Sequence, residues 1–550
     1  MKLPIPQAAI AAIACGLFFA APKASANPGE AGVEYGIVPK PFSLEARKEN
    51  PFVIKADTSI VYQNEASKPA AEYLQDRIAA ATGLQLAVRD SGGSNAIVLR
   101  IDPERVEFNE KDAYTFESGG KNITITGKSA SGLFYGIQTL FQLLPPGIYG
   151  DTPVADMNLT VDALTIQDKP SMGKIRGLHV DISRHFRTKE ELKKIIDSMA
   201  MHKLNTLHLH LSDDEGWRVE IKAYPKLTSV GAIGNKTDPN APAAFLTQEH
   251  VKELCAYAAR RHVAIIPEID MPGHMGAVIK AYPELKHPKE ERDPGKVIRG
   301  DAMGRDFAKK VLAEINSLFD PEYIHIGCDE VNLKSPVELY SKAELVDFAR
   351  EVTTFVKEEL KKRPIVWDDA FTTGFEDKET VVHWWRYGKK FWWKKMDTTV
   401  DERLNLKQQP FIFSPANWTY FDMKNEGKGG WAGRISPAEM YNWDPFGDML
   451  GVTPETRQLA RGAIACTWSE EIPTMKVFGD RTYPRLAGFS ERIWSGGKSD
   501  NPSILAWADY RDKVLIPFQL KRYDALGLWY WSKDNPALLK TLPDEKKALP

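Results

Sequence analysis

The sequence predicts an α/β protein in which a (β/α)8 TIM barrel is preceded by a small α+β domain. From residue 174 onward, apolar strand-like runs alternate with long helical patterns, and polar residues follow the ends of most runs. The residues before that point mix short strands with two helices instead. The 550 residues suffice for both parts, because an α/β barrel takes about 250 residues.

Composition excludes several classes of protein. Hydrophobic residues make up 43% and charged residues 27%, as in an ordinary globular chain, which excludes a disordered or collagen-like protein. A net charge of −2 argues against nucleic acid as the main partner. Four cysteines are too few for a disulfide scaffold. The 14 tryptophans are unusual, and tryptophan serves both cores and flat ligand faces.

Residues 1–26 read as a secretory signal peptide. Lys2 gives a positive start, residues 8–21 are almost wholly apolar, and residues 24–26 form a small-residue cleavage site of the A-x-A type. We therefore expect an exported protein, periplasmic or extracellular, with no membrane span after cleavage. The alternatives are an uncleaved anchor and a lipoprotein attached through Cys15, the second weakened by Ala12 at a position where leucine is usual.

Three further segments follow the signal peptide. Residues 35–168 are predicted to form the α+β domain, residues 170–515 the barrel, and residues 516–550 a C-terminal tail. Within the α+β domain we expect helices at Ala70–Ala81 and Ser129–Leu144, a strand at Ala96–Ile101, and a hairpin around Gly119-Gly120.

The barrel is predicted from its strand-like runs. They are Ile175–Ile182, Thr206–Leu211, Val263–Pro267, Tyr323–Ile326, Pro364–Trp367, Thr380–His383, Phe411–Ser414 and Ala463–Trp468. Helical patterns fit between several of them, at Lys189–His202, Thr247–His262, Arg305–Phe319 and Lys342–Lys361.

Two adjacent carboxylates leave the end of the fourth predicted strand. Asp329 and Glu330 would point to opposite faces of a regular strand, so a bend is needed to aim both into the barrel mouth. Close carboxylates repel, and one pKa should rise, as acid–base cleavage of a glycosidic bond requires. A lone Asp-Glu pair most often lies in a loop, where both side chains are solvated. Here the strand, Gly327 and the polar ends of other strands favour a functional pair.

Histidines on the second strand offer a competing interpretation. His208 and His210 lie at i and i+2, on one face of the strand, which resembles a metal-ligand pair. We favour hydrogen-bonded histidines packed inside the barrel, because no later Cys/His set completes a metal site. Asp213, a little further along, is a better site candidate, and so is His274 on a Pro-Gly turn after the third strand.

Aromatic residues cluster near the ends of the later strands. Trp walls combined with carboxylates and arginine suit sugars, which present apolar C–H faces and hydroxyl edges. The residues concerned are Trp367, Trp385, Tyr420, Asp422, Trp468 and Glu470. The segment Trp384–Lys395 is unusually aromatic and basic, and forms either a lid or glycan subsite, or a partly buried loop that anchors itself.

Together these motifs resemble the β-N-acetylhexosaminidases of glycoside hydrolase family 20. The resemblance rests on the order and spacing of six segments and covers most of the mature chain. They are Arg176–Phe186, Leu204–Arg218, Glu268–His274, His325–Val331, and the closing segments around Trp468–Glu470 and Arg485–Trp494.

The resemblance implies exo-acting hydrolysis of terminal, non-reducing β-linked GlcNAc or GalNAc from glycans. In this family the substrate's own 2-acetamido oxygen is the nucleophile, an exception to glycosidases with an enzyme nucleophile. Glu330 would be the acid and base, and Asp329 would orient the acetamido N–H. Tyr420 would bind the acetamido oxygen. Trp367, Trp385 and Trp468 would wall the acetamido group and the sugar ring. Arg184, Asp422 and Glu470 would bind the hydroxyl groups of the ring. Asp213 and His274 would support Glu330.

The same resemblance implies a glycan partner and no cofactor or metal. Oligomeric state cannot be read from the sequence. The alternatives are a lacto-N-biosidase-like enzyme that releases disaccharides, a catalytically silent glycan-binding protein, and a metal-dependent hydrolase that uses His208 and His210. One departure from the family pattern is Cys328, where many members have a second glycine; a larger residue there is expected to affect the backbone bend.

Overall fold

The computed structural model describes most of residues 33–542. The exceptions within that range are 292–294, 332, 334–338, 387–389, 392–393, 396–403, 405–406, 428–429, 449–452 and 502. The predicted signal peptide, residues 1–26, lies outside the described residues, and so does part of the Trp384–Lys395 segment.

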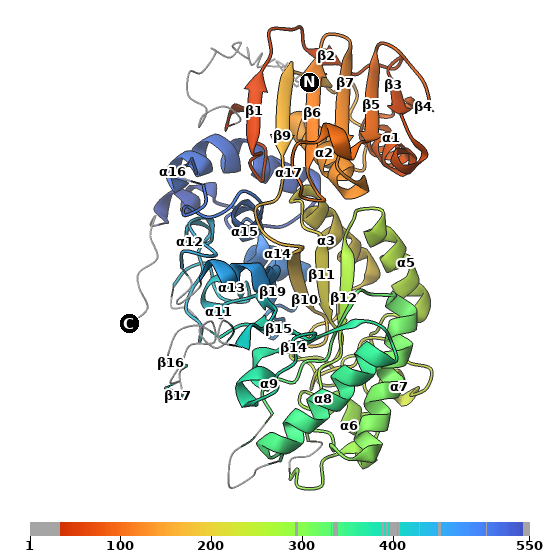
Figure 1. The fold of residues 1–550 in the computed structure, drawn as a ribbon, viewed down its shortest axis with the longest axis vertical. Coiled ribbons are helices and arrows are strands. Elements are labelled where there is room, and N and C mark those ends of the chain that lie inside the picture. Colours follow the sequence, from red (N-terminus) through yellow and green to blue (C-terminus); the bar gives the residue numbers. More distant parts are fainter. Residues whose placement is uncertain are drawn as a thin grey trace, which may run out of the picture.

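The N-terminal domain is a mixed sheet covered by two helices, α1 (Lys68–Thr82) and α2 (Ala130–Leu143) (Figure 1). Its strand order is β1-β9-β6-β7-β5-β3-β4. The bounds are β1 Ser43–Ala46, β3 Ser59–Tyr62, β4 Ala87–Arg89, β5 Ala96–Ile101, β6 Tyr114–Gly119, β7 Asn122–Gly127 and β9 Leu164–Asp168. Helix α1 ends where Gly83 adopts a left-handed φ of +78°, the stop that the sequence predicts. Strands β6 and β7 form the predicted hairpin.

A closed barrel of eight parallel strands forms the second domain, as the alternating pattern predicts. The strands are β10 Ile175–Asp181, β11 Thr206–His210, β12 Ala264–Glu268, β13 Tyr323–His325, β14 Arg363–Trp367, β15 Val381–Trp384, β18 Phe411–Phe413 and β19 Ala460–Thr467. The surrounding helices include α3 Lys189–Met201, α5 Gln248–Ala259, α7 Ala302–Phe319 and α8 Lys342–Glu358.

Side-chain caps explain where these barrel helices begin. Thr188, Thr247 and Ser341 each accept a hydrogen bond from the backbone three residues on, at the start of α3, α5 and α8. Asp301 does the same for α7 and accepts from two backbone N–H groups. Each cap satisfies an N–H that a helix terminus otherwise leaves without a partner.

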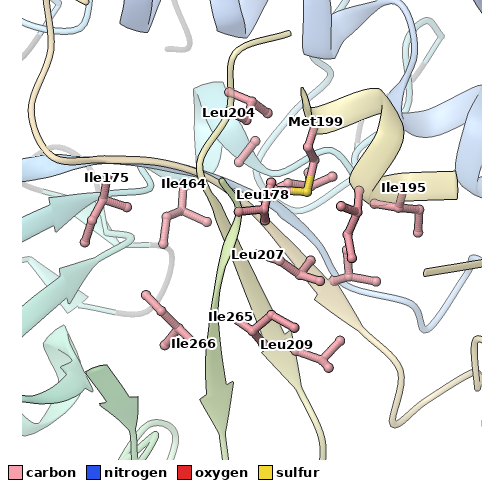
Figure 2. Close-up of a cluster of buried hydrophobic side chains, with 14 of the residues drawn as sticks. Ile175, Leu178, Ile195, Met199, Leu204, Leu207, Leu209, Ile265, Ile266 and Ile464 are labelled. Atoms are coloured by element: carbon pink, nitrogen blue, oxygen red, sulfur yellow. The ribbon is translucent and has the colours of Figure 1, made fainter. Parts of the chain in front are cut away.

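Aliphatic side chains fill the layer between the barrel strands and α3 (Figure 2). Leu178 and Leu207, from neighbouring strands, face Ile195 and Met199 of α3, and all four are buried. Leu178, Leu207 and Leu209 alternate along their strands with the polar residues His179, His208 and His210. On β10 and β11 the leucines therefore face the helices and the histidines face the lumen.

The C-terminal segment is packed against the body of the protein, although the sequence predicts a tail from residue 516. Helix α17 (Leu520–Ala525) lies beside the 3-10 helix η4 (Pro146–Tyr149) of the first domain. Buried Arg522 donates hydrogen bonds to the carbonyl oxygens of Gly36 (2.6 Å) and Gln142 (2.8 Å). Tertiary contacts with the first domain therefore order a segment whose local pattern is weak.

None of the helices in the described part of the chain combines the length and the apolarity that crossing a bilayer requires.

Candidate active site

A cavity of about 610 Å³ opens at the carboxyl ends of the barrel strands. Its walls contain every residue to which the family resemblance gives a role, except Asp213. The lining comprises Arg184, His274, Asp329, Glu330, Trp367, Trp385, Tyr420, Asp422, Met423, Lys424, Gly430, Trp431, Trp468, Glu470 and Glu471. The mouth of a TIM barrel is where active sites are found, so the cavity is the candidate site.

A left-handed turn after β13 carries Asp329 and Glu330 into the cavity. Gly327, Cys328 and Glu330 have φ values of +69°, +72° and +49°. A Cβ on Gly327 would lie 1.7 Å from Asp270 Oδ1, so only glycine fits that position. The turn supplies the bend by which two consecutive side chains reach the same cavity.

The two carboxyl groups differ in pKa, but not in the way that mutual repulsion alone predicts. Burial is the main cause that raises the pKa of Asp329, to about 6. Hydrogen bonding to His274 is the main cause that lowers the pKa of Glu330, whose side chain is 52% exposed. In the ligand-free site Asp329 is therefore the weaker acid and Glu330 the stronger one.

His274 links Glu330 to a buried chain of charges behind the cavity. Its Nε2 lies 3.6 Å from Glu330 Oε2 and 3.8 Å from Asp329 Oδ2, while its Nδ1 hydrogen-bonds Asp213 Oδ1 at 3.1 Å. Asp213 in turn binds Arg184 Nη2 at 2.6 Å. Burial opposes the charged form of His274, but Asp213, Glu330 and Asp329 together outweigh it and raise the His274 pKa well above its usual value.

Aromatic rings form the side walls. Trp367 and Trp468 lie 5.7 Å apart between ring centroids, and Tyr420 lies 6.2 Å from Trp468. Trp385 stacks at 6.3 Å on Tyr420 and donates its indole N–H to Asp369 Oδ2 at 2.9 Å. Such walls match the apolar face of a sugar ring.

Carboxyl groups and one arginine close the far side of the cavity. Burial, and secondarily the charge of Glu470, raise the pKa of Asp422 well above its usual range. Arg184 Nη2 lies 3.8 Å from Glu470 Oε1, and its guanidinium stacks over Trp468 at 5.1 Å. This edge presents acceptors and donors to hydroxyl groups, because carboxyl oxygens accept in either protonation state and guanidinium donates.

The histidines of β11 lie inside the barrel, below the cavity. His210 Nδ1 binds Glu268 Oε2 at 2.7 Å, and its Nε2 binds Asp213 Oδ2 at 2.9 Å. His208 Nε2 lies 3.0 Å from the same Glu268 oxygen. His208, Glu268 and His325 could each offer one atom to a metal ion, and these three atoms lie within 4.8 Å of one another. The packed, hydrogen-bonded arrangement that we favoured accounts for His210, which has a partner on both ring nitrogens. His208 is packed inside the barrel as expected, but neither of its ring nitrogens makes a hydrogen bond to a residue that the structure describes.

The start of the aromatic and basic segment is anchored. Trp384 is buried, Trp385 lines the cavity, and the guanidinium of Arg386 binds the carboxylates of Asp368 and Asp369. Further on, β16 (Lys390–Phe391) pairs with β17 (Lys394–Lys395).

Sequence reasoning missed several cavity residues. Trp431 is 42% exposed at the rim and meets Trp385 edge-on at 5.8 Å. Lys424 and Glu471 also line the cavity. Trp431 follows Gly429-Gly430, and a tryptophan in a glycine-rich loop was the available signal. Glu471 directly follows Glu470, whereas Lys424 carries no signal of its own.

Comparison with known proteins agrees with the fold and the cavity. The model of the glycosyl hydrolase family 20 catalytic domain matches residues 174–497, and the model of domain 2 of the same family matches residues 34–169. A β-N-acetylhexosaminidase from Cellulomonas fimi is 30% identical over 91% of this chain and 96% of its own length. A β-hexosaminidase from Porphyromonas gingivalis is also 30% identical, over 84% of this chain, which spans 60% of that protein.

Solved structures give the same answer. The N-acetyl-β-hexosaminidase of Streptomyces plicatus in complex with Thio-NAglucal superposes with a TM-score of 0.79 at 30% identity, covering 93% of this chain and 99% of that one. A mutant of the same enzyme bound to its product GlcNAc has a TM-score of 0.79 at 29% identity, covering 94% of this chain and 99% of that one. The chain therefore belongs to glycosyl hydrolase family 20 and is a glycoside hydrolase of the β-N-acetylhexosaminidase type.

Proposed function

We propose that the protein removes terminal β-linked GlcNAc or GalNAc from the non-reducing ends of glycans, with the substrate's 2-acetamido group as nucleophile. The observation that carries the proposal is the turn after β13, from which Asp329 and Glu330 both enter a cavity with aromatic walls. The product-bound state of the Streptomyces plicatus relative supports a terminal N-acetylhexosamine as the bound sugar.

Glu330 protonates the leaving oxygen and then activates water. Its 52% exposure is consistent with a position where an aglycone leaves the cavity, and the attacking water restores the proton that Glu330 gave to the leaving oxygen. Binding of the aglycone covers Glu330 and removes water from it, which raises its pKa. The low pKa of the free side chain is thus a property of the open site.

Asp329 orients the acetamido group. The N–H of that group donates to the Asp329 carboxylate and favours its ionised form, which opposes the effect of burial. Tyr420 donates its hydroxyl to the acetamido oxygen, and Trp367, Trp385 and Trp468 enclose the group and the ring. The acetamido oxygen then attacks C1 as the C1–O bond to the aglycone breaks, and the oxazolinium intermediate is hydrolysed with net retention.

The hydroxyl groups of the sugar face the polar edge of the cavity. Arg184 donates to the hydroxyls at positions 3 and 4, while Glu470 and Asp422 accept from those at positions 4 and 6. Asp213 holds both Arg184 and His274 and so couples sugar binding to the acid–base group.

Paired release rates test the proposal. Aryl β-N-acetylglucosaminide and aryl β-glucoside differ in the group at C2, and the proposal predicts fast release from the first and very slow release from the second. Equal release would show that the acetamido group is not the nucleophile. An aryl lacto-N-bioside tests disaccharide release, and binding of N-acetylhexosamine glycans without product would indicate a silent binding protein. Undiminished activity with a strong chelator would exclude a labile catalytic metal.

We also propose export to the periplasm or the exterior. Support comes from the apolar stretch of residues 8–21 and the small-residue site at residues 24–26. N-terminal sequencing of the mature protein should begin at Asn27, and a start at Met1 would contradict cleavage.

A further inference from the structure

Asp270 lies directly beneath the turn that carries the two proposed catalytic carboxyl groups, and none of the roles above uses it. It follows β12 and is buried. Its Oδ1 accepts a hydrogen bond from the backbone N–H of Cys328 at 3.1 Å. The same oxygen occupies the space in which a side chain on Gly327 would lie. Asp270 therefore fastens the left-handed turn from below, including Cys328, whose φ of +72° carries a steric cost.

The second carboxyl oxygen of Asp270 lies in a buried environment close to Asp329. Asp270 Oδ2 and Asp329 Oδ1 are both buried, and neither has a hydrogen-bond partner outside the pair among the residues that the structure describes. The two carboxyl groups are close enough to hydrogen-bond to each other. Two buried carboxylates would repel each other strongly, whereas a single proton between them satisfies both oxygens.

We propose that Asp270 is a positioning residue that keeps a proton and donates it in a hydrogen bond to Asp329. The bond holds Asp329 ionised and in one orientation, ready for the acetamido N–H. This inference rests on the proposed function, since it explains how Asp329 is prepared for its role there.

The surrounding charges decide which of the two acids keeps the proton. Burial, followed by the charge of Asp329, raises the pKa of Asp270 well above its usual value, Glu268 adds to the effect, and His274 opposes it. Burial raises the pKa of Asp329 to about 6, and Asp369 and Glu330 add to the rise, whereas His274 and the hydrogen bond to Asp270 oppose it. Asp329 therefore ionises while Asp270 retains its proton.

Two substitutions separate the hydrogen bond from packing. In Asp270→Asn the amide oxygen can still accept from Cys328 and the amide N–H₂ can donate to Asp329, so turnover should stay close to wild type. Asp270→Leu keeps a similar volume without donor or acceptor, and kcat should fall about 10- to 100-fold, with KM less affected, because Asp329 loses its buried partner. Circular dichroism checks that both variants fold.

The pH dependence of kcat/KM provides a readout that a packing defect would not move. Loss of a donor to the charged form raises the pKa of Asp329, so the activity limb near pH 6 should shift to higher pH in Asp270→Leu and stay in place in Asp270→Asn. An Asp270→Asn variant that folds but loses as much activity as Asp270→Leu would overturn the proposal. So would unshifted profiles in both.

Melting temperatures test the retained proton without any turnover. Between the usual pKa of an aspartate and the raised one, the folded chain binds the proton of Asp270 and the unfolded chain does not, so wild type loses stability as pH rises. The amide introduced by Asp270→Asn does not titrate. The melting temperature of Asp270→Asn relative to wild type should therefore increase from about pH 4 to about pH 8. A constant difference would overturn the retained proton, whereas a wild type without hydrolytic activity would contradict only the proposed function.

Discussion

The lumen of the barrel and its mouth are built from the same residue types on the same strands, yet only the mouth has the properties of a reactive site. β11, β12 and β13 supply His210, Glu268 and His325 to the lumen, and the loops that follow supply Asp213, Asp270 and Asp329 to the mouth. Histidine and carboxylate are thus stacked in two layers. The layers differ in access to solvent and in how completely charge is balanced.

In the lumen the protonation states are locked. Burial lowers the pKa of His325 to about 3. Burial acts on His210 in the same direction, but Glu268 and Asp213 together outweigh it and raise the pKa to about 10. Glu268 itself, surrounded by histidines that outweigh its burial, has a pKa well below its usual range. None of these groups changes charge near neutrality.

At the mouth, by contrast, groups titrate where an enzyme works. Burial raises the pKa of Asp329 to about 6 and that of Asp368 to about 7. Glu330 is half exposed beside a charged His274. Proton transfer needs groups whose pKa lies near the working pH, so the mouth is suited to chemistry and the lumen to support.

Removing the carboxylic acid of Glu330 is the strongest test of this division. Glu330→Gln cannot donate or accept the proton, and turnover of an aryl β-N-acetylglucosaminide should fall by about 10²- to 10⁴-fold. Thermal unfolding should change little, because the side chain is 52% exposed. Glu249→Gln, on the solvent face of α5, is the matched control and should leave kcat unchanged. Full activity in Glu330→Gln would refute the assignment.

A substitution in the lumen should act on stability instead. Glu268→Gln removes one of the two buried carboxylates that His210 contacts, and breaking such a buried pair costs about 3–5 kcal/mol of unfolding free energy. Urea unfolding measures the loss. The remaining folded fraction should keep a far larger share of wild-type turnover than Glu330→Gln. An unchanged midpoint would show that the lumen charges are not coupled as the geometry indicates.

The pH profile sharpens the comparison further. The proposed reaction needs Glu330 protonated and Asp329 ionised, so kcat/KM should be bell-shaped between two apparent pKa values that belong to the pair. The lower lies below the usual value for glutamate and the upper near 6, because kcat/KM reports the free enzyme. Activity should therefore peak on the acidic side of neutrality. A plateau extending to pH 8 would contradict this order of titration.

The smallest expected effect belongs to the rim. Trp431→Ala removes an exposed ring that meets Trp385 and Tyr420 edge-on at 5.8 Å. We expect KM for a β-linked GlcNAc oligosaccharide to rise by up to about tenfold, the value of one aromatic contact, with kcat for a small aryl substrate unchanged. Equal effects on both substrates would place Trp431 inside the sugar pocket rather than at its edge.

Sequence alone determined the architecture of this protein, because the spacing of apolar residues and the succession of strands and helices can be read from neighbouring positions in the chain. The alternation of apolar runs with helical patterns predicts each of the eight barrel strands to within a few residues, and Gly83 ends its helix as predicted. The polar strand ends also identify most of the cavity lining, because parallel strands bring their carboxyl ends to one face.

Only the tertiary structure decided the chemistry of each carboxyl group. Asp213 and Asp329 are both buried, yet Arg184 and His274 outweigh burial and keep the pKa of Asp213 well below its usual range, while that of Asp329 rises. The partnership of Asp270 with Asp329 joins residues 59 positions apart, in loops that follow different strands. A pKa depends on burial and on charges that long-range folding brings together, and neither can be read from neighbouring residues in the chain.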